Sequence, residues 1–288
     1  MQKKAIEFIL TVIVSKVDTD TYAEIKYACD EVAQNADKLK TCYVKALRRY
    51  NKQKITYTQK QLSEANSICN GWLPPLTLVD AVRTLLLLHT KFSDTQMQLS
   101  NLQSMVDCGD NNEQIVIYQN LALLPHADTL ALFCAQGLRS NMADIFEAIA
   151  NNNPYPAKYL ADDAFNQMVL KCVFIGKPLY KIVGLHQRLN PNLSRMIIDY
   201  AAERWAASRS LSPEVWQLTP IIENAHKDLY LKLQRSNIES EQKAASLLFY
   251  SNESAKALGL LPQKQHQTLI ENNELNWQTL GALVWHNN

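Results

Sequence analysis

The chain has 288 residues, of which 29 are basic and 28 acidic, so its formal net charge is +1. Hydrophobic residues make up 47% of it, which is enough to bury a sizeable core and excludes a disordered protein. The near-zero charge argues against a nucleic-acid-binding protein, which needs a basic surface to displace counterions from phosphate.

The composition predicts an all-α fold. Leucines (39) far outnumber valines (14), and unbranched side chains keep more rotamer freedom in a helix. No segment has the clear alternation of a strand, and the best candidate, 115–118, also fits a buried helix. In chain order we predict helices over 2–16, 22–50 (with a break left open), 59–70, 77–90, 93–107, 112–124, 126–138, 142–151, 161–175, 178–183, 191–208, 213–218, 220–235, 239–251, 262–271 and 276–285.

Glycines and capping residues indicate where these helices begin and end. Thr58 followed by Gln61 is a capping-box pattern. Asn190 before Pro191 and Ser212 before Pro213 each predict an N-cap followed by a proline in the first turn. Left-handed residues are expected just after four apolar segments, at Gly71, Gly176, Gly184 and Gly259.

Many mid-length helices with short connections predict antiparallel helical hairpins, stacked as a degenerate HEAT-like or other α-α superhelix. No linker longer than a few residues separates the segments, so we expect a single domain over 1–288. The alternative is a division of the chain near 52–58 or near 209–220.

The cysteines and the N-terminal segment indicate a cytoplasmic protein. None of the six cysteines forms a Cys-x-x-Cys pair, so we expect reduced, mostly buried thiols. The apolar stretch 5–14 follows two lysines as in a signal peptide, but Glu7 interrupts it and no small-residue cleavage site follows. Its apolar positions have helical spacing, which favours an amphipathic first helix; a short signal sequence is the alternative.

No catalytic residue, metal site or cofactor is predicted. The chain lacks a phosphate-binding glycine loop, a Gly-x-Ser-x-Gly turn and a His-Glu-x-x-His motif, and its histidines are far apart in sequence. Asp162 and Asp163 with Asn166 partly resemble the magnesium-binding Asp-Asp-x-x-Asp of all-helical isoprenoid synthases. Two acids in a first turn also complement the helix dipole, which is the simpler interpretation.

The segment 151–216 is the densest in polar and aromatic residues. We predict a polar pocket between two of its helices, with Asn166, Gln167 and Lys171 facing Arg195 and Asp199. A pocket rich in amides and low in net charge suits a neutral hydroxylated or aromatic metabolite better than a phosphate. The alternative is an exposed surface with ordinary i,i+4 pairs. The full set of candidate ligand-binding residues is Asn152, Asn166, Gln167, Lys171, Arg195, Asp199, Tyr200 and Arg204.

Several sequence segments, which follow one another in the order given next, resemble the EboA family of bacterial metabolite-traffic proteins. They are Asn153-Pro154-Tyr155-Pro156-Ala157, Phe165-Asn166-Gln167-Met168-Val169-Leu170-Lys171, Ile182-Val183-Gly184-Leu185, Asn190-Pro191-Asn192-Leu193-Ser194-Arg195-Met196 and Asp199-Tyr200-Ala201-Ala202-Glu203-Arg204-Trp205. Gly71-Trp72 and the run 81–88 are also similar. The resemblance covers about 70–216.

The resemblance implies a role in secondary metabolism but supplies no catalytic residues. Such proteins are encoded beside a UbiA-type membrane prenyltransferase and other enzymes, in a cluster associated with moving precursors such as the scytonemin monomer from cytoplasm to periplasm. We therefore expect a non-enzymatic cytoplasmic binding or adaptor protein with other Ebo-cluster proteins as partners, and a peripheral position at the inner membrane as the alternative to a freely diffusing one. The alternatives are an all-α enzyme acting on a prenyl diphosphate or cyclitol-like intermediate, and a scaffold held at the membrane by the first helix.

Overall fold

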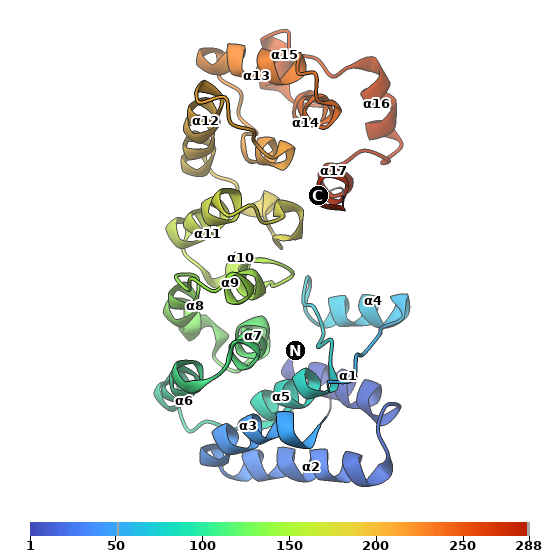
Figure 1. Cartoon of the computed structure of the whole chain (residues 1–288), viewed down its shortest axis with the longest axis vertical. Helices are drawn as coiled ribbons and strands as arrows, with labels where there is room; N and C mark the ends of the chain where they lie inside the picture. Colours follow the sequence, from blue (N-terminus) through green and yellow to red (C-terminus); the bar gives the residue numbers. More distant parts are fainter. Residues whose placement is uncertain (51, 287–288) are drawn as a thin grey trace. The chain divides into compact units, whose positions relative to one another are not determined.

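The computed structural model describes residues 1–50 and 52–286 as α-helices and short 3-10 helices (Figure 1). There is no strand among them, and the only extended pairing there is an isolated antiparallel bridge between Lys54 and Thr77. The prediction of an all-α fold is therefore confirmed. The HEAT-like stacking of the hairpins stays a prediction.

The chain divides into two compact units, Met1–Ala161 and Asp162–Asn288, and the boundary lies in neither of the two expected places. The segment near 52–58 is tied into unit 1, because the Ile55 N–H donates to the Leu76 carbonyl. The segment 209–220 contains a short 3-10 helix, Pro213–Leu218, all of whose residues are buried. The actual boundary is hard to see in the sequence, since only Leu160 and Ala161 separate two helices there and neither is a proline or glycine.

Unit 1 is built around one nearly fully buried helix, α5. Apolar residues occupy all sides of α5, so it packs against α1, α2, α3 and α7 together. The helices of this unit are α1 (Gln2–Val14), α2 (Thr19–Gln34), η1 (Ala36–Lys38), α3 (Leu39–Arg49), α4 (Gln59–Ile68), α5 (Leu78–His89), α6 (Thr95–Cys108), α7 (Asn111–Gln119), η2 (Leu121–Leu123), η3 (Ala127–Leu130), α8 (Ala131–Gly137), α9 (Ala143–Ala150) and α10 (Tyr155–Tyr159).

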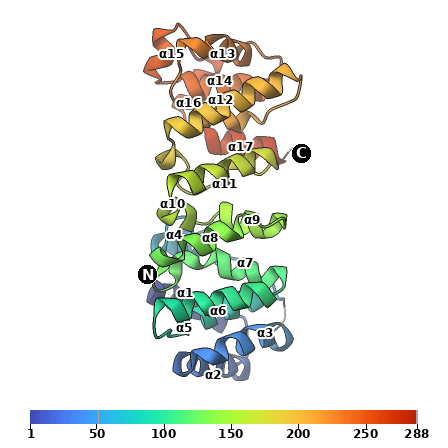
Figure 2. The same ribbon diagram turned by 90° about the vertical axis from the view of Figure 1, so that its left-hand side faces the viewer.

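Unit 2, coloured from yellow-green to red in Figure 2, is built around the 3-10 helix η6, all of whose residues are buried. Its Trp216 is fully buried and packs against the rings of Trp205 and Tyr230, at centroid distances of 5.2 and 5.9 Å. The helices of this unit are α11 (Asp162–Phe174), η4 (Leu179–Lys181), η5 (His186–Arg188), α12 (Pro191–Ala206), η6 (Pro213–Leu218), η7 (Asn224–His226), α13 (Lys227–Gln234), α14 (Glu239–Phe249), α15 (Glu253–Ala257), α16 (Lys264–Glu271) and α17 (Trp277–His286).

Most of the predicted helix ends are found where local signals placed them. Thr58 and Gln61 form the expected capping box, and the Asn190 side chain accepts from the Leu193 N–H. The four glycines predicted to be left-handed all have positive φ, between 64° and 80°: Gly71, Gly176, Gly184 and Gly259.

The structure settles one open point and corrects two others. The break left open in 22–50 is present, because Asn35 takes an extended conformation and its side chain caps the short η1. Ser212 precedes a 3-10 helix and makes no side-chain cap, and its hydroxyl is buried without a partner. The short helices α10 and α15 were not expected; each has only five residues, too few to show a periodic pattern.

Candidate functional site

A surface hollow of about 430 Å³ lies between α11 and α12 in unit 2. Four of the predicted ligand-binding residues line it together: Asn166, Gln167, Arg195 and Asp199. The remaining lining residues are Asp163, Asn192 and Met196.

Helical spacing explains why these side chains share one face. On α11, Asn166 and Gln167 follow Asp163 by three and four residues. On α12, Arg195, Met196 and Asp199 follow Asn192 by three, four and seven residues. Residues three, four and seven apart lie on the same side of a helix, so each helix directs a short polar stripe into the hollow.

The two helices are joined beneath the hollow by a pair of asparagines. The Asn166 Nδ2 donates to the Asn190 Oδ1 at 3.1 Å, and the Asn190 Nδ2 donates to the Asn166 Oδ1 at 2.9 Å. The Asn190 Oδ1 also accepts from the Leu193 N–H, which caps α12. Asn166 is 3% exposed and its amide is already bonded, so it positions the walls of the hollow and is not free to bind a ligand.

The charged groups of the hollow are exposed and unpaired with each other. They are one arginine, Arg195, and two aspartates, Asp163 and Asp199. Among the described residues none of the three is in an ion pair, including the i,i+4 pair expected between Arg195 and Asp199. Two carboxylates repel a phosphate, whereas amides, a guanidinium and carboxylates together offer donors and acceptors to a hydroxylated molecule.

The other predicted ligand-binding residues do not line the hollow. Tyr200 packs edge-on against Phe174 at 4.9 Å, and the Arg204 guanidinium donates to the Ser210 carbonyl at 2.7 and 3.2 Å. Lys171 is half-buried near the far end of α11. Asn152, exposed and with φ of 50°, belongs to the other compact unit.

The acid pair at the start of α11 is divided between two environments. Asp162 forms an ion pair with Arg188 at 2.9 Å, and Arg188 also lies 4.7 Å from the centre of the Phe165 ring. Asp163 turns into the hollow. Within residues 1–50 and 52–286, no three His, Cys, Asp or Glu side chains are grouped so that they could hold a metal ion.

Sequence reasoning missed Asn190, Asn192 and Met196, although a usable signal was present. Asn192 and Met196 complete the spacing that begins with Arg195 and Asp199 on the same helix. Asn190 was predicted only as the N-cap of α12. Its second role is the hydrogen bond to Asn166, and the sequence pattern does not show a contact between residues 24 apart.

In unit 1, buried hydrogen bonds are formed by residues of the segments that resemble the EboA family, namely Trp72, Thr84 and Asn153. The Trp72 indole N–H donates to the Asn120 Oδ1 at 3.1 Å, and the Asn120 Nδ2 donates to the Thr84 hydroxyl at 3.1 Å. Asn153 donates to the carbonyls of Tyr118 and Ala148, at 3.0 and 2.9 Å. These residues therefore hold the fold together, since buried polar groups need partners.

Comparison with known proteins gives one match. Residues 5–220 match the family model described as "Metabolite traffic protein EboA", which extends further toward the N-terminus than the expected 70–216. No curated protein and no solved structure matches the chain. None of the described helices is both long and apolar enough to cross a membrane.

Proposed function

The chain belongs to the EboA family, and from this we propose that it is a non-enzymatic binding or adaptor protein for a secondary-metabolite precursor. It works in the cytoplasm and passes the precursor toward the periplasm. The ligand is received in the hollow between α11 and α12. The observation that carries this proposal is that Gln167, Arg195 and Asp199, chosen from sequence as ligand-binding, line one hollow.

The lining supports a ligand that is uncharged and hydroxylated. A volume of about 430 Å³ falls within the usual range of about 300–1,000 Å³ for small-molecule sites. Gln167 and Asn192 offer amide donors and acceptors to the hydroxyl groups of such a ligand. Met196 offers an adaptable apolar contact, which would suit an aromatic ring if the ligand carries one.

A binding experiment with matched control variants tests the proposal. The purified protein is incubated with a low-molecular-weight extract of its host cells, and the retained compound is identified by native mass spectrometry. We expect Arg195→Gln and Asp199→Asn to lose the compound by at least about tenfold, since each removes a charge-assisted hydrogen bond. The controls are Arg209→Gln and Glu203→Gln, which change exposed residues outside the hollow. The proposal fails if no compound is retained, or if all four variants retain it equally.

The same sample tests the absence of catalysis. After prolonged incubation the retained compound should keep its mass, because no serine, threonine, cysteine, lysine or histidine lines the hollow and the described residues include no grouped metal ligands. A new product that disappears in Asp163→Asn would show an enzyme instead.

We propose that partners from the Ebo cluster, including the UbiA-type membrane prenyltransferase, contact a surface other than the apolar face of α1. That face packs inside unit 1, where Ile9 and Ile13 are buried and α1 contacts α5. Any peripheral position at the inner membrane then depends on the partner. Membrane fractionation with and without the prenyltransferase tests this, and a protein that stays membrane-bound without it would contradict the idea.

A further inference from the structure

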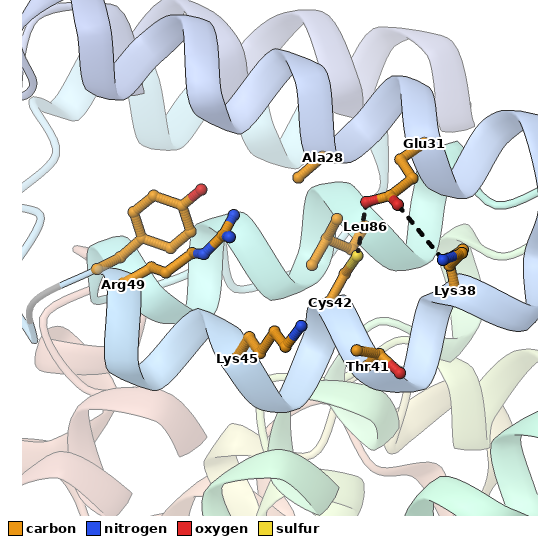
Figure 3. A pocket seen from close by; sticks show the side chains of 9 residues that line it. Ala28, Glu31, Lys38, Thr41, Cys42, Lys45, Arg49 and Leu86 are labelled. Carbon is orange, nitrogen blue, oxygen red and sulfur yellow. Dashed lines mark hydrogen bonds and ion pairs between the residues drawn. The ribbon is translucent and has the colours of Figure 1, made fainter.

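A second, more enclosed pocket lies between α2 and α3 in unit 1 (Figure 3). Its volume is about 90 Å³, which admits a group of only a few non-hydrogen atoms. Ala28 and Leu86 give it an apolar part, while most of the remaining lining is polar and basic. The basic side chains are Lys38, Lys45 and Arg49, against a single acid, Glu31.

The charged side chains are distributed unevenly along the pocket. Glu31 is compensated at one end, where Lys38 lies 3.8 Å from it and the Cys42 thiol donates to it at 3.4 Å. Burial, and then the hydrogen bond to Glu31, raise the pKa of Cys42, so the thiol stays neutral and adds no negative charge. Lys45 and Arg49 extend from α3 into the space beside Cys42 (Figure 3). Neither is in an ion pair with any of the described residues.

A hydroxyl without a partner completes the basic end. Tyr50 is 5% exposed, and its buried Oη makes no hydrogen bond by geometry; burial raises the pKa of this hydroxyl, and the adjacent Arg49 side chain opposes the rise. A buried hydroxyl that is left unbonded lowers stability, so most such groups in proteins are satisfied by protein, water or ligand. Tyr50 lines this pocket, where its hydroxyl can donate to an acceptor that enters.

The position of these residues at a helix end does not by itself explain them. Cations near a helix C-terminus complement its dipole, and this accounts for Arg48, which does not line the pocket; Lys45 and Arg49 are as exposed to solvent as Arg48, but both line it. It does not account for Lys45, one turn earlier, reaching the same space as Arg49 and a buried hydroxyl. Two exposed cations that form no ion pair with the described residues, beside the buried Tyr50 hydroxyl, are the chemistry that binds an oxyanion.

We propose that the pocket between α2 and α3 binds a small oxyanionic group, a carboxylate or a phosphate, through Lys45, Arg49 and the Tyr50 hydroxyl. The small volume means that the ligand is a small acid or the anionic end of a larger molecule. The site is independent of the hollow between α11 and α12, so either proposal can fail without the other.

Titration of the full-length protein with two simple probes tests the site. Sodium phosphate and sodium acetate are titrated by calorimetry at fixed ionic strength, with sodium chloride as the reference. At least one probe should bind with a heat that chloride does not give and should raise the Tm. Binding of phosphate alone identifies a phosphoryl ligand, and binding of acetate identifies a carboxylate. Absence of binding by both probes overturns the proposal.

Five variants distinguish this site from general attraction of anions to a basic surface. Arg49→Gln and Lys45→Gln should each weaken the bound probe at least about tenfold, and Tyr50→Phe about threefold, because the phenylalanine keeps the packing and removes only the hydroxyl. Arg48→Gln makes the same charge change in the same turn and should leave the affinity unchanged. An equal loss in Arg48→Gln and Arg49→Gln overturns the proposal. Far-UV circular dichroism verifies folding, and Arg49→Lys, which keeps the charge, should retain part of the affinity.

Discussion

The two units bury a glutamate in different ways. In unit 1 the Glu113 carboxylate has a cation as its partner: the Arg83 Nη2 lies 2.7 Å from its Oε1, and both side chains are less than a tenth exposed. In unit 2 Glu214 is fully buried, and no cation among the described residues is in an ion pair with it.

The arginine of unit 1 connects three helices. From α5, the Arg83 Nε donates to the Tyr43 carbonyl on α3 at 3.3 Å, while its guanidinium binds Glu113 on α7. Glu113 also accepts from the Asp110 N–H and so completes the capping box of α7. Both charges are thus neutralised and hydrogen-bonded, which a buried ion pair requires.

The glutamate of unit 2 depends on N–H donors alone. It accepts from the backbone N–H groups of Leu179 and Tyr180, at 3.3 and 2.7 Å, and from the Trp285 indole N–H. Burial raises the pKa of Glu214, and these three hydrogen bonds oppose the rise. The comparison shows that dipolar donors satisfy the oxygens but compensate a buried charge less completely than an arginine does.

The largest expected effect comes from removing the cation of unit 1. Arg83→Met should lower the free energy of unfolding by about 3–5 kcal/mol, because it leaves the Glu113 charge buried and uncompensated. Urea denaturation followed by circular dichroism measures the loss. The double variant with Glu113→Gln should recover part of it. A loss below about 1 kcal/mol in the single variant would show that the ion pair does not stabilise unit 1.

A glycine beside each carboxylate gives a second, smaller contrast. A Cβ at Gly109 would lie 2.5 Å from the Met105 carbonyl oxygen and 3.2 Å from the Glu113 Oε2. A Cβ at Gly281 would lie 2.5 Å from both the Glu214 Oε1 and the Tyr180 ring.

Gly109→Ala should therefore destabilise by about 1–3 kcal/mol, since a backbone oxygen cannot move aside. Gly281→Ala should destabilise somewhat less, because alanine gains up to about 1 kcal/mol in a helix, although the Tyr180 Cβ at 2.8 Å and the buried Glu214 carboxylate leave little room to shift. Thermal unfolding of the two variants measures the difference. The reverse order would contradict this account of the two sites.

The smallest expected effect is a pH dependence that arises from Glu214. A carboxyl whose pKa is raised in the folded state stabilises the fold fully below its unfolded value of 4.5, and that contribution is lost as pH rises through the folded value. The stability of the wild type minus that of Glu214→Gln should thus fall as pH rises above 4.5. Urea unfolding of both proteins in steps from about pH 4 to pH 8 measures it. A difference that grows with pH would mean that the N–H donors outweigh burial.

The candidate hollow was partly predictable from sequence. Helical periodicity placed Gln167 on one face of α11, and Arg195 and Asp199 on one face of α12. That these two faces meet in one hollow, across the segment 175–190 with its two 3-10 helices, is decided by the tertiary structure. The burial of Asn166 was not predictable, since its partner Asn190 lies 24 residues away and an amide pattern gives no sign of which amides pair.

The pocket between α2 and α3 was invisible in the sequence for a different reason. The sequence left a break within 22–50 open but did not place it, and in an unbroken helix Glu31 and Lys45 could not face each other. Only the break at Asn35 folds α3 back beside α2, so that Glu31 and Arg49 line the same space.

The sequence by itself determined the all-α class, most helix ends and the left-handed glycines. These depend on contacts within three or four residues, which periodicity and capping residues record directly. The tertiary structure alone decided the boundary at 161–162, the partners of Glu113 and Glu214, and which polar side chains share a cavity. These features depend on contacts between residues that are distant in sequence. Such contacts have no fixed spacing along the chain from which they could be predicted.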